Sequence, residues 1–229
     1  MAKKQNAANA AEQSIGNAMS RTELFFENHG KSLTVGLVVL VLLGGILVGY
    51  RKLVMEPRNE KALDLLAQAQ ANFEEAETDY ELALNGDDNG AGFLEVIDRY
   101  GSTKAGNLAK HYAGICYLKQ GDLENAANYL SKYSPAKGIP GAIINAQNYG
   151  LQGDIAVEQQ NYREAVKFYE KAVDAADNNV TAPLFLMKAG RAYKAMGDNA
   201  KAKACFERIA TSYPASAEAR DTEKYINSL

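Results

Sequence analysis

The stretch that decides the fold is Leu184–Ser216, LFLMKAGRAYKAMGDNAKAKACFERIATSYPAS, in a chain of 229 residues. Gly197-Asp198 separates two helix-forming segments. Gly197 supplies a turn, and Asp198 is the N-cap of the second helix. Small residues at Ala189-Gly190 and Ala202 mark places where two helices approach closely, because a larger side chain there would overpack. Phe206 supplies apolar bulk on the second helix. The stretch therefore predicts a helical hairpin with a tight internal contact.

The same pattern occurs twice more upstream. One copy contains Ala113-Gly114, Tyr117, Gly121, Ala126, Leu130 and Tyr133, and the other contains Gln152-Gly153, Ala156, Gln160, Tyr162, Ala165, Tyr169 and Ala172. This pattern resembles the tetratricopeptide repeat (TPR) family. The resemblance implies helical hairpins that bury their apolar faces only by stacking on one another.

A fourth, degenerate copy precedes these three. Phe93-x-x-Val96-Ile97-x-x-Tyr100 matches Phe206-x-x-Ile209-Ala210-x-x-Tyr213. We expect its first helix over residues 57–84 and a capping helix over 217–229. The predicted fold is all-α, with a TPR-like domain over 51–229 that contains a degenerate repeat at 57–103 and repeats at about 107–138, 146–178 and 183–216.

An uncharged run precedes the repeats. Residues 33–50 read LTVGLVVLVLLGGILVGY, eighteen residues that span about 27 Å as a helix, close to a hydrocarbon core of about 30 Å. A cleaved signal peptide and a buried core helix are the alternatives. The run exceeds a typical signal-peptide core, and no A-x-A-like cleavage site follows it. We therefore predict one uncleaved transmembrane helix, in which Gly45 and Gly49 form a GxxxG helix-pairing face.

Composition argues against nucleic-acid binding. Beyond Tyr50 the chain has 21 basic and 25 acidic residues, with no basic stripe interleaved with aromatic residues. The two cysteines, Cys116 and Cys205, make no disulfide framework, and we expect both to be small core residues.

The sequence also contains no recognisable catalytic motif. The histidines are His29 and His111, and no HExxH, GxSxG, P-loop or paired-cysteine motif occurs. Residues 85–90, NGDDNG, begin like a calcium loop, but Val96 stands at its closing position, so we expect a Gly-rich turn. We predict no enzymatic activity, no cofactor, no metal site and no small-molecule substrate.

The TPR resemblance implies a partner-binding groove lined by the first helix of each hairpin. Some TPR grooves carry a carboxylate clamp of Lys, Asn and Arg, but here His111 and Ile115 stand at two of its positions, so we expect no clamp. The groove mixes apolar and charged residues, which suits a broad protein surface or an extended peptide. For His111 a solvated helix residue is the alternative. The predicted groove residues are His111, Ile115, Leu118, Asp154, Val157, Glu158, Met187, Arg191 and Lys194.

The segments beside the apolar run carry a second resemblance. Phe25-Phe26-Glu27-Asn28-His29-Gly30-Lys31, Tyr50-Arg51, Pro57 and Glu60-Lys61-Ala62 resemble the YfgM-like family of bacterial inner-membrane proteins. The resemblance implies a single span between a cytoplasmic tail, here residues 1–32, and a periplasmic TPR domain. It further implies a role ancillary to the Sec translocon, with translocon subunits, periplasmic chaperones or exported chains as partners. Within the tail we expect a short helix at the membrane surface over residues 12–29.

Charge does not support that orientation by itself. Arg51, Lys52, Arg58 and Lys61 follow the run, whereas Arg21 and Lys31 precede it, so the positive-inside rule alone would place the repeats in the cytoplasm. We follow the family resemblance and predict periplasmic repeats. The alternative function is a coordinator of another envelope assembly, such as outer-membrane biogenesis or the division machinery.

Overall fold

The computed structural model describes residues 29–76 and 79–229, which belong to two compact units, 1–57 and 58–229. In the first unit, residues 29–50 are helical and lead into a π-helical turn, η1 (Arg51–Met55). The predicted surface helix of residues 12–29 lies outside the described residues except for its last residue. The described helical stretch His29–Glu75 contains an eighteen-residue window of mean hydropathy 2.5, none of it buried. By length and composition, this helix could cross a membrane.

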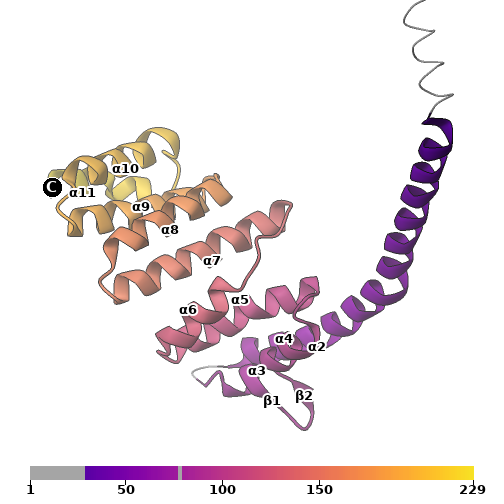
Figure 1. Cartoon of the computed structure of the whole chain (residues 1–229). Helices are drawn as coiled ribbons and strands as arrows, with labels where there is room; N and C mark the ends of the chain where they lie inside the picture. The colour runs from indigo at the N-terminus through magenta and orange to yellow at the C-terminus, as the bar shows by residue number, and fades with distance from the viewer. Residues whose placement is uncertain (1–28, 77–78) are drawn as a thin grey trace, which may run out of the picture. The chain divides into compact units, whose positions relative to one another are not determined.

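The second unit is built from helical hairpins that follow one another along the chain (Figure 1). Apart from one minimal β-hairpin, its described elements are helices, so the predicted all-α class is confirmed. The elements are α2 (Glu56–Glu75), α3 (Glu81–Asn85), β1 (Gly86–Asp87), β2 (Gly90–Ala91), α4 (Phe93–Tyr100), α5 (Lys104–Lys119), α6 (Leu123–Ser131), α7 (Ile139–Glu158), α8 (Tyr162–Ala175), α9 (Thr181–Ala195), α10 (Asn199–Ser212), η2 (Glu218–Asp221) and α11 (Thr222–Asn227).

The α5–α6, α7–α8 and α9–α10 hairpins turn in the same way. The second helix of each begins after an N-cap whose side chain accepts a backbone N–H bond from three residues on, at 3.0, 3.4 and 3.2 Å for Asp122, Asn161 and Asp198. The residue before each cap has a positive φ, +82° at Gly121, +58° at Gln160 and +76° at Gly197. A repeated local conformation therefore sets the hairpin angle three times.

Within each of these hairpins, a bulky side chain of the second helix fits against a glycine of the first. A Cβ added to Gly114 would lie 2.5 Å from Leu130 Cγ. The same distance separates a Cβ at Gly153 from the Tyr169 ring, and a Cβ at Gly190 from the Phe206 ring. Ala126, Ala165 and Ala202 are fully buried on the second helices, as predicted.

Buried apolar residues form two large clusters and one small one. One large cluster runs from Ala62 to Cys116 and the other from Ala146 to Tyr213. Between them lies a cluster whose buried members are Ala126, Leu130 and Ile155. The hydrophobic core is therefore thinnest where α6 is followed by α7.

The degenerate unit differs from the prediction. The helix expected over 57–84 is two helices, because α2 ends at Glu75 and α3 starts at Glu81, where the Asp79 carboxylate accepts the Glu81 N–H at 2.9 Å. The break lets Tyr80 pack on Phe73, with ring centroids 5.5 Å apart. The expected Gly-rich turn is the β1–β2 hairpin, where the Asp87 carboxylate accepts backbone bonds from Asn89 and Gly90.

Two other boundaries also differ. The second full repeat was expected from about residue 146, but α7 begins at Ile139, preceded by Gly138 with φ +89° and with Pro140 in its first turn. The capping segment expected over 217–229 is divided between the 3₁₀ helix η2 and α11. Tyr225 of α11 stacks on Phe206 with ring centroids 5.2 Å apart, so the segment does cover the end of the array.

We expect Gly153→Ala to destabilise the repeats by about 1–3 kcal/mol, because the new methyl group would meet the Tyr169 ring. Helix propensity alone predicts the opposite sign, a gain of about 1 kcal/mol. Urea unfolding followed by circular dichroism measures the difference. In a Tyr169→Ala background the ring is gone, so the same substitution should stabilise. Stabilisation of the otherwise native chain by Gly153→Ala would contradict the tight contact.

Candidate protein-binding surface

The predicted groove residues lie on α5, α7 and α9, the first helices of the three full hairpins, three on each helix. Glu158 and Arg191 are exposed. A second group is partly buried: Ile115, Leu118, Asp154, Val157 and Lys194. The remaining two, His111 and Met187, belong to the interior, with 3% and 8% of their surfaces exposed.

A hydrogen-bonded ion pair joins α7 to α9 on this face. Lys188 Nζ lies 2.8 and 2.7 Å from the two carboxylate oxygens of Asp154. The Tyr169 hydroxyl donates to the same carboxylate at 2.8 Å. Burial, followed by the charge of Asp154, raises the pKa of Tyr169, so this hydroxyl stays protonated and remains a donor. Asp154 therefore fixes the spacing of two first helices.

His111 is buried in the structure, so the solvated alternative is wrong, and its contacts are with residues of this chain. Its Nδ1 lies 3.2 Å from the amide Nδ2 of Asn148 on α7, and Asn148 Oδ1 accepts a bond from Gln152 at 2.7 Å. Tyr112 and Tyr133 pack on the imidazole, with ring centroids 5.8 and 5.7 Å away. Burial lowers the pKa of His111 to about 4, so the ring is neutral at pH 7 and Nδ1 is the acceptor for the amide donor.

Three other predicted groove residues make packing contacts or hydrogen bonds with other parts of this chain. Met187 belongs to the C-terminal apolar cluster, and Leu118 packs against the small cluster between the two cores. Lys194 donates to the Ser228 carbonyl and hydroxyl oxygens, both at 2.8 Å, and so holds the end of the capping segment. Ile115, Val157, Glu158 and Arg191 keep the exposure that a partner contact requires, and their role stays a prediction.

The two glycines predicted as a helix-pairing face belong to the apolar helix of residues 29–50. A Cβ added to Gly45 or Gly49 would meet nothing within 4 Å. Neither glycine is therefore required by packing within the described residues.

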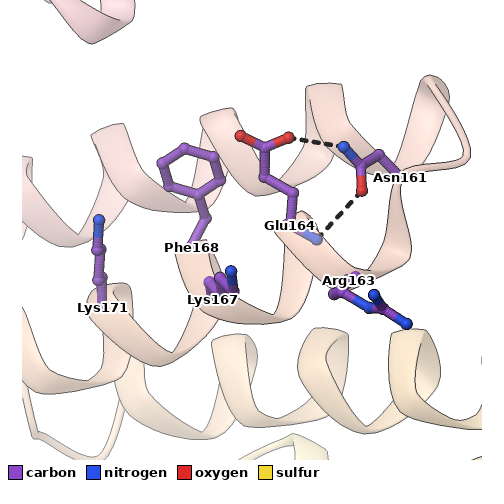
Figure 2. A pocket seen from close by; sticks show the side chains of 6 residues that line it. All are labelled: Asn161, Arg163, Glu164, Lys167, Phe168 and Lys171. Carbon is purple, nitrogen blue, oxygen red and sulfur yellow. Dashed lines mark hydrogen bonds between the residues drawn. The ribbon is translucent and has the colours of Figure 1, made fainter.

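A basic stripe on α8 was missed by the sequence reasoning. Arg163, Lys167 and Lys171 recur every fourth residue and are exposed, so they share one face of the helix beside Phe168 (Figure 2). Lys171 Nζ lies 5.4 Å from the centroid of the Phe168 ring. The stripe borders a hollow of about 300 Å³ that also includes Asn161 and Glu164. The four-residue spacing of the basic residues was the signal that could have revealed it.

Neither cysteine is activated for chemistry. Cys116 is fully buried, as expected, and Cys205 is partly buried. Burial raises the pKa of Cys116 to about 12 and that of Cys205 to about 11, so both thiols are protonated at pH 7. Among the described residues, no group of three His, Cys, Asp or Glu side chains is arranged to hold a metal ion.

Neutral, buried His111 should make the repeats sensitive to acid. Its pKa is lower in the folded chain than the unfolded value of 6.5, so the unfolded chain binds the proton first and stability falls as pH drops from about 6.5 to about 4. Between pH 7 and pH 5 the loss should be about 2 kcal/mol. Urea unfolding of the full chain and of His111→Gln at both pH values measures it. The variant should lose less stability than the parent, and equal losses would contradict a buried neutral imidazole.

The repeat region is similar to known proteins. Residues 156–222 match the tetratricopeptide repeat model. A TPR repeat-containing protein of Methanocaldococcus jannaschii is 32% identical over 122 residues, which cover 53% of this chain and 20% of that protein. The match thus spans about a fifth of the length of this relative.

Solved structures were also matched. The N-terminal domain of stress-induced protein-1 from C. elegans is 20% identical, with a TM-score of 0.43, over 52% of this chain and 93% of that one. The TPR2B domain of yeast Sti1, in its pHsp70 complex, is 16% identical, with a TM-score of 0.41, over 53% of this chain and 93% of that one. Residues 156–222 are thus similar to tetratricopeptide repeats, and the α5–α6, α7–α8 and α9–α10 hairpins of this chain repeat one helical form.

Proposed function

We propose that this protein is a non-enzymatic scaffold, held in the bacterial inner membrane by one helix, which presents its repeats to protein partners in the periplasm. Its role is ancillary to the Sec translocon and to periplasmic chaperone traffic. The proposal combines the apolar helix, the tetratricopeptide repeats and the YfgM-like residues beside the apolar run.

The observation that carries the proposal is the contrast between the two units. In the repeats, large apolar residues such as Phe93, Phe206 and Ile209 are completely buried. In the apolar helix, Leu40 and Leu47 are 67% and 69% exposed. A continuous apolar surface along a helix is costly to expose to water, and insertion into a bilayer would take these side chains out of water.

Membrane anchoring would allow weak contacts between the repeats and a partner to contribute to binding. Confinement to the same membrane as a partner raises the effective concentration, so that a span contact and a repeat contact act together. Gly45 and Gly49 offer close approach to a partner helix, because small residues allow backbones to pack tightly. Ile115, Val157 and Arg191 offer apolar and basic contacts on the repeats.

We expect Sec translocon subunits to co-purify with the full chain from gently solubilised membranes, as identified by mass spectrometry. Gly45→Ile combined with Gly49→Ile should deplete them, because the added side chains block close helix packing. Gly36→Ile is the matched control, since Gly36 lies in the same run and is equally open. Absence of translocon subunits from all preparations would contradict the translocon role, and recovery of another envelope assembly instead would favour the alternative.

A separate experiment tests the orientation. Protease added to intact spheroplasts should digest residues 51–229, because we place them outside the cytoplasm. Immunoblotting with antibodies to the repeats follows the digestion, and a cytoplasmic protein serves as the control for intact cells. Repeats that are protected until lysis would reverse the proposed topology and agree with the positive-inside rule.

A further inference from the structure

A second hollow lies where the segment 132–138 joins α6 to α7. Its volume is about 860 Å³, within the range of about 300–1,000 Å³ that is usual for ligand pockets. The walls come from the start of α5, the joining segment and the start of α7. None of the predicted groove residues borders it. We call it the loop hollow.

Side-chain amides hold one wall of the loop hollow in place. Asn107 of α5 donates to the Ser134 carbonyl at 2.7 Å and accepts from the Ser134 N–H at 2.8 Å. Asn145 of α7 makes the same pair of bonds with Ala136, both at 2.9 Å. The buried Tyr133 hydroxyl also donates to Asn145, at 2.8 Å. The segment is thus preorganised, and a ligand would not have to order it on binding.

The lining of the loop hollow is positively charged. It includes Lys104, Lys110 and Lys137 but no carboxylate. Lys110 is fixed by a bond from its Nζ to the Gly101 carbonyl at 2.9 Å, whereas Lys104 and Lys137 are exposed. Three like charges around one hollow repel each other, and an anionic ligand would relieve that repulsion.

The same hollow has apolar walls. Leu108 and Ile144 are partly buried in its lining, and Pro140 is exposed there. Ile139 and Ile143, next to this lining in sequence, are 80% and 40% exposed. A ligand that fits both features must therefore combine negative charge with apolar side chains, and a small inorganic anion would leave the apolar wall in water.

From this combination we infer that the loop hollow binds an extended acidic peptide segment of a partner protein, with its carboxylates beside the lysines and its apolar side chains against Leu108 and Ile144. The inference goes beyond the proposed scaffold function, because it requires neither the membrane anchor nor the translocon. Extended chain suits the site because alternate side chains point in opposite directions, so carboxylates and apolar groups can meet different walls.

The test uses the full chain in micelles of a neutral detergent and a fluorescein-labelled octapeptide of alternating Asp and Leu. Fluorescence anisotropy should report binding, after subtraction of a micelle blank. Lys104→Glu combined with Lys137→Glu should weaken it about tenfold or more. The matched control is Lys167→Glu combined with Lys171→Glu, which makes the same change in charge on α8 and should alter the affinity less than about twofold.

A second probe separates charge from apolar contact. An octapeptide of alternating Asn and Leu should bind the full chain at least about tenfold more weakly, since it lacks the carboxylates. No binding of the Asp–Leu peptide at about 1 mM would overturn the inference. Equal weakening by the two double variants, or equal affinity for the two peptides, would overturn it as well. Because the readout involves no translocon subunit, the inference and the proposed function can fail independently.

Discussion

In three successive hairpins, a bulky side chain occupies the space that a Cβ on the facing helix would need. Leu130, Tyr169 and Phe206 each follow the glycine they cover by sixteen residues. That contact cannot slip by one residue, because the neighbouring position would bring a side chain into the same space. It fixes the register of each second helix against its first helix. The N-caps and positive-φ turns agree with this register, so local conformation and packing favour the same hairpin.

The α6–α7 junction differs from the other junctions between hairpins in the contacts that hold it. Elsewhere along the array apolar side chains cross from one hairpin to the next, and Phe185 of α9, for example, covers Gly150 of α7. Beside the small apolar cluster there, His111 of α5 is paired with Asn148 of α7, and Asn107 and Asn145 bind the joining segment 132–138. Buried polar groups of this kind stabilise an arrangement only while every partner is in place. The side-chain hydrogen bonds of Asn107 and Asn145 to this segment also hold one wall of the loop hollow.

The repeats could be predicted from sequence because the close contact within each hairpin requires a recognisable pattern, a glycine followed at a fixed distance by a large apolar residue. The burial of His111 could not, since its position in the repeat says which face it shares but not that Asn148 and Tyr133 will cover it. The break after Glu75 was also not predicted, because helix-forming residues lie on both sides of it, and the packing of Tyr80 on Phe73 cannot be read from the sequence. The early start of α7 was marked by Gly138 and Pro140, which local capping rules could have used.

The thin core between α6 and α7 has a mechanical consequence. Opening a contact surface costs free energy in proportion to the apolar area it exposes, and here that area comes mainly from Ala126, Leu130 and Ile155. The cores on either side bury more residues, among them Phe93 in one and Phe206 in the other. Separating the two large cores at residues 132–138 should therefore expose less apolar area, and cost less free energy, than opening either core.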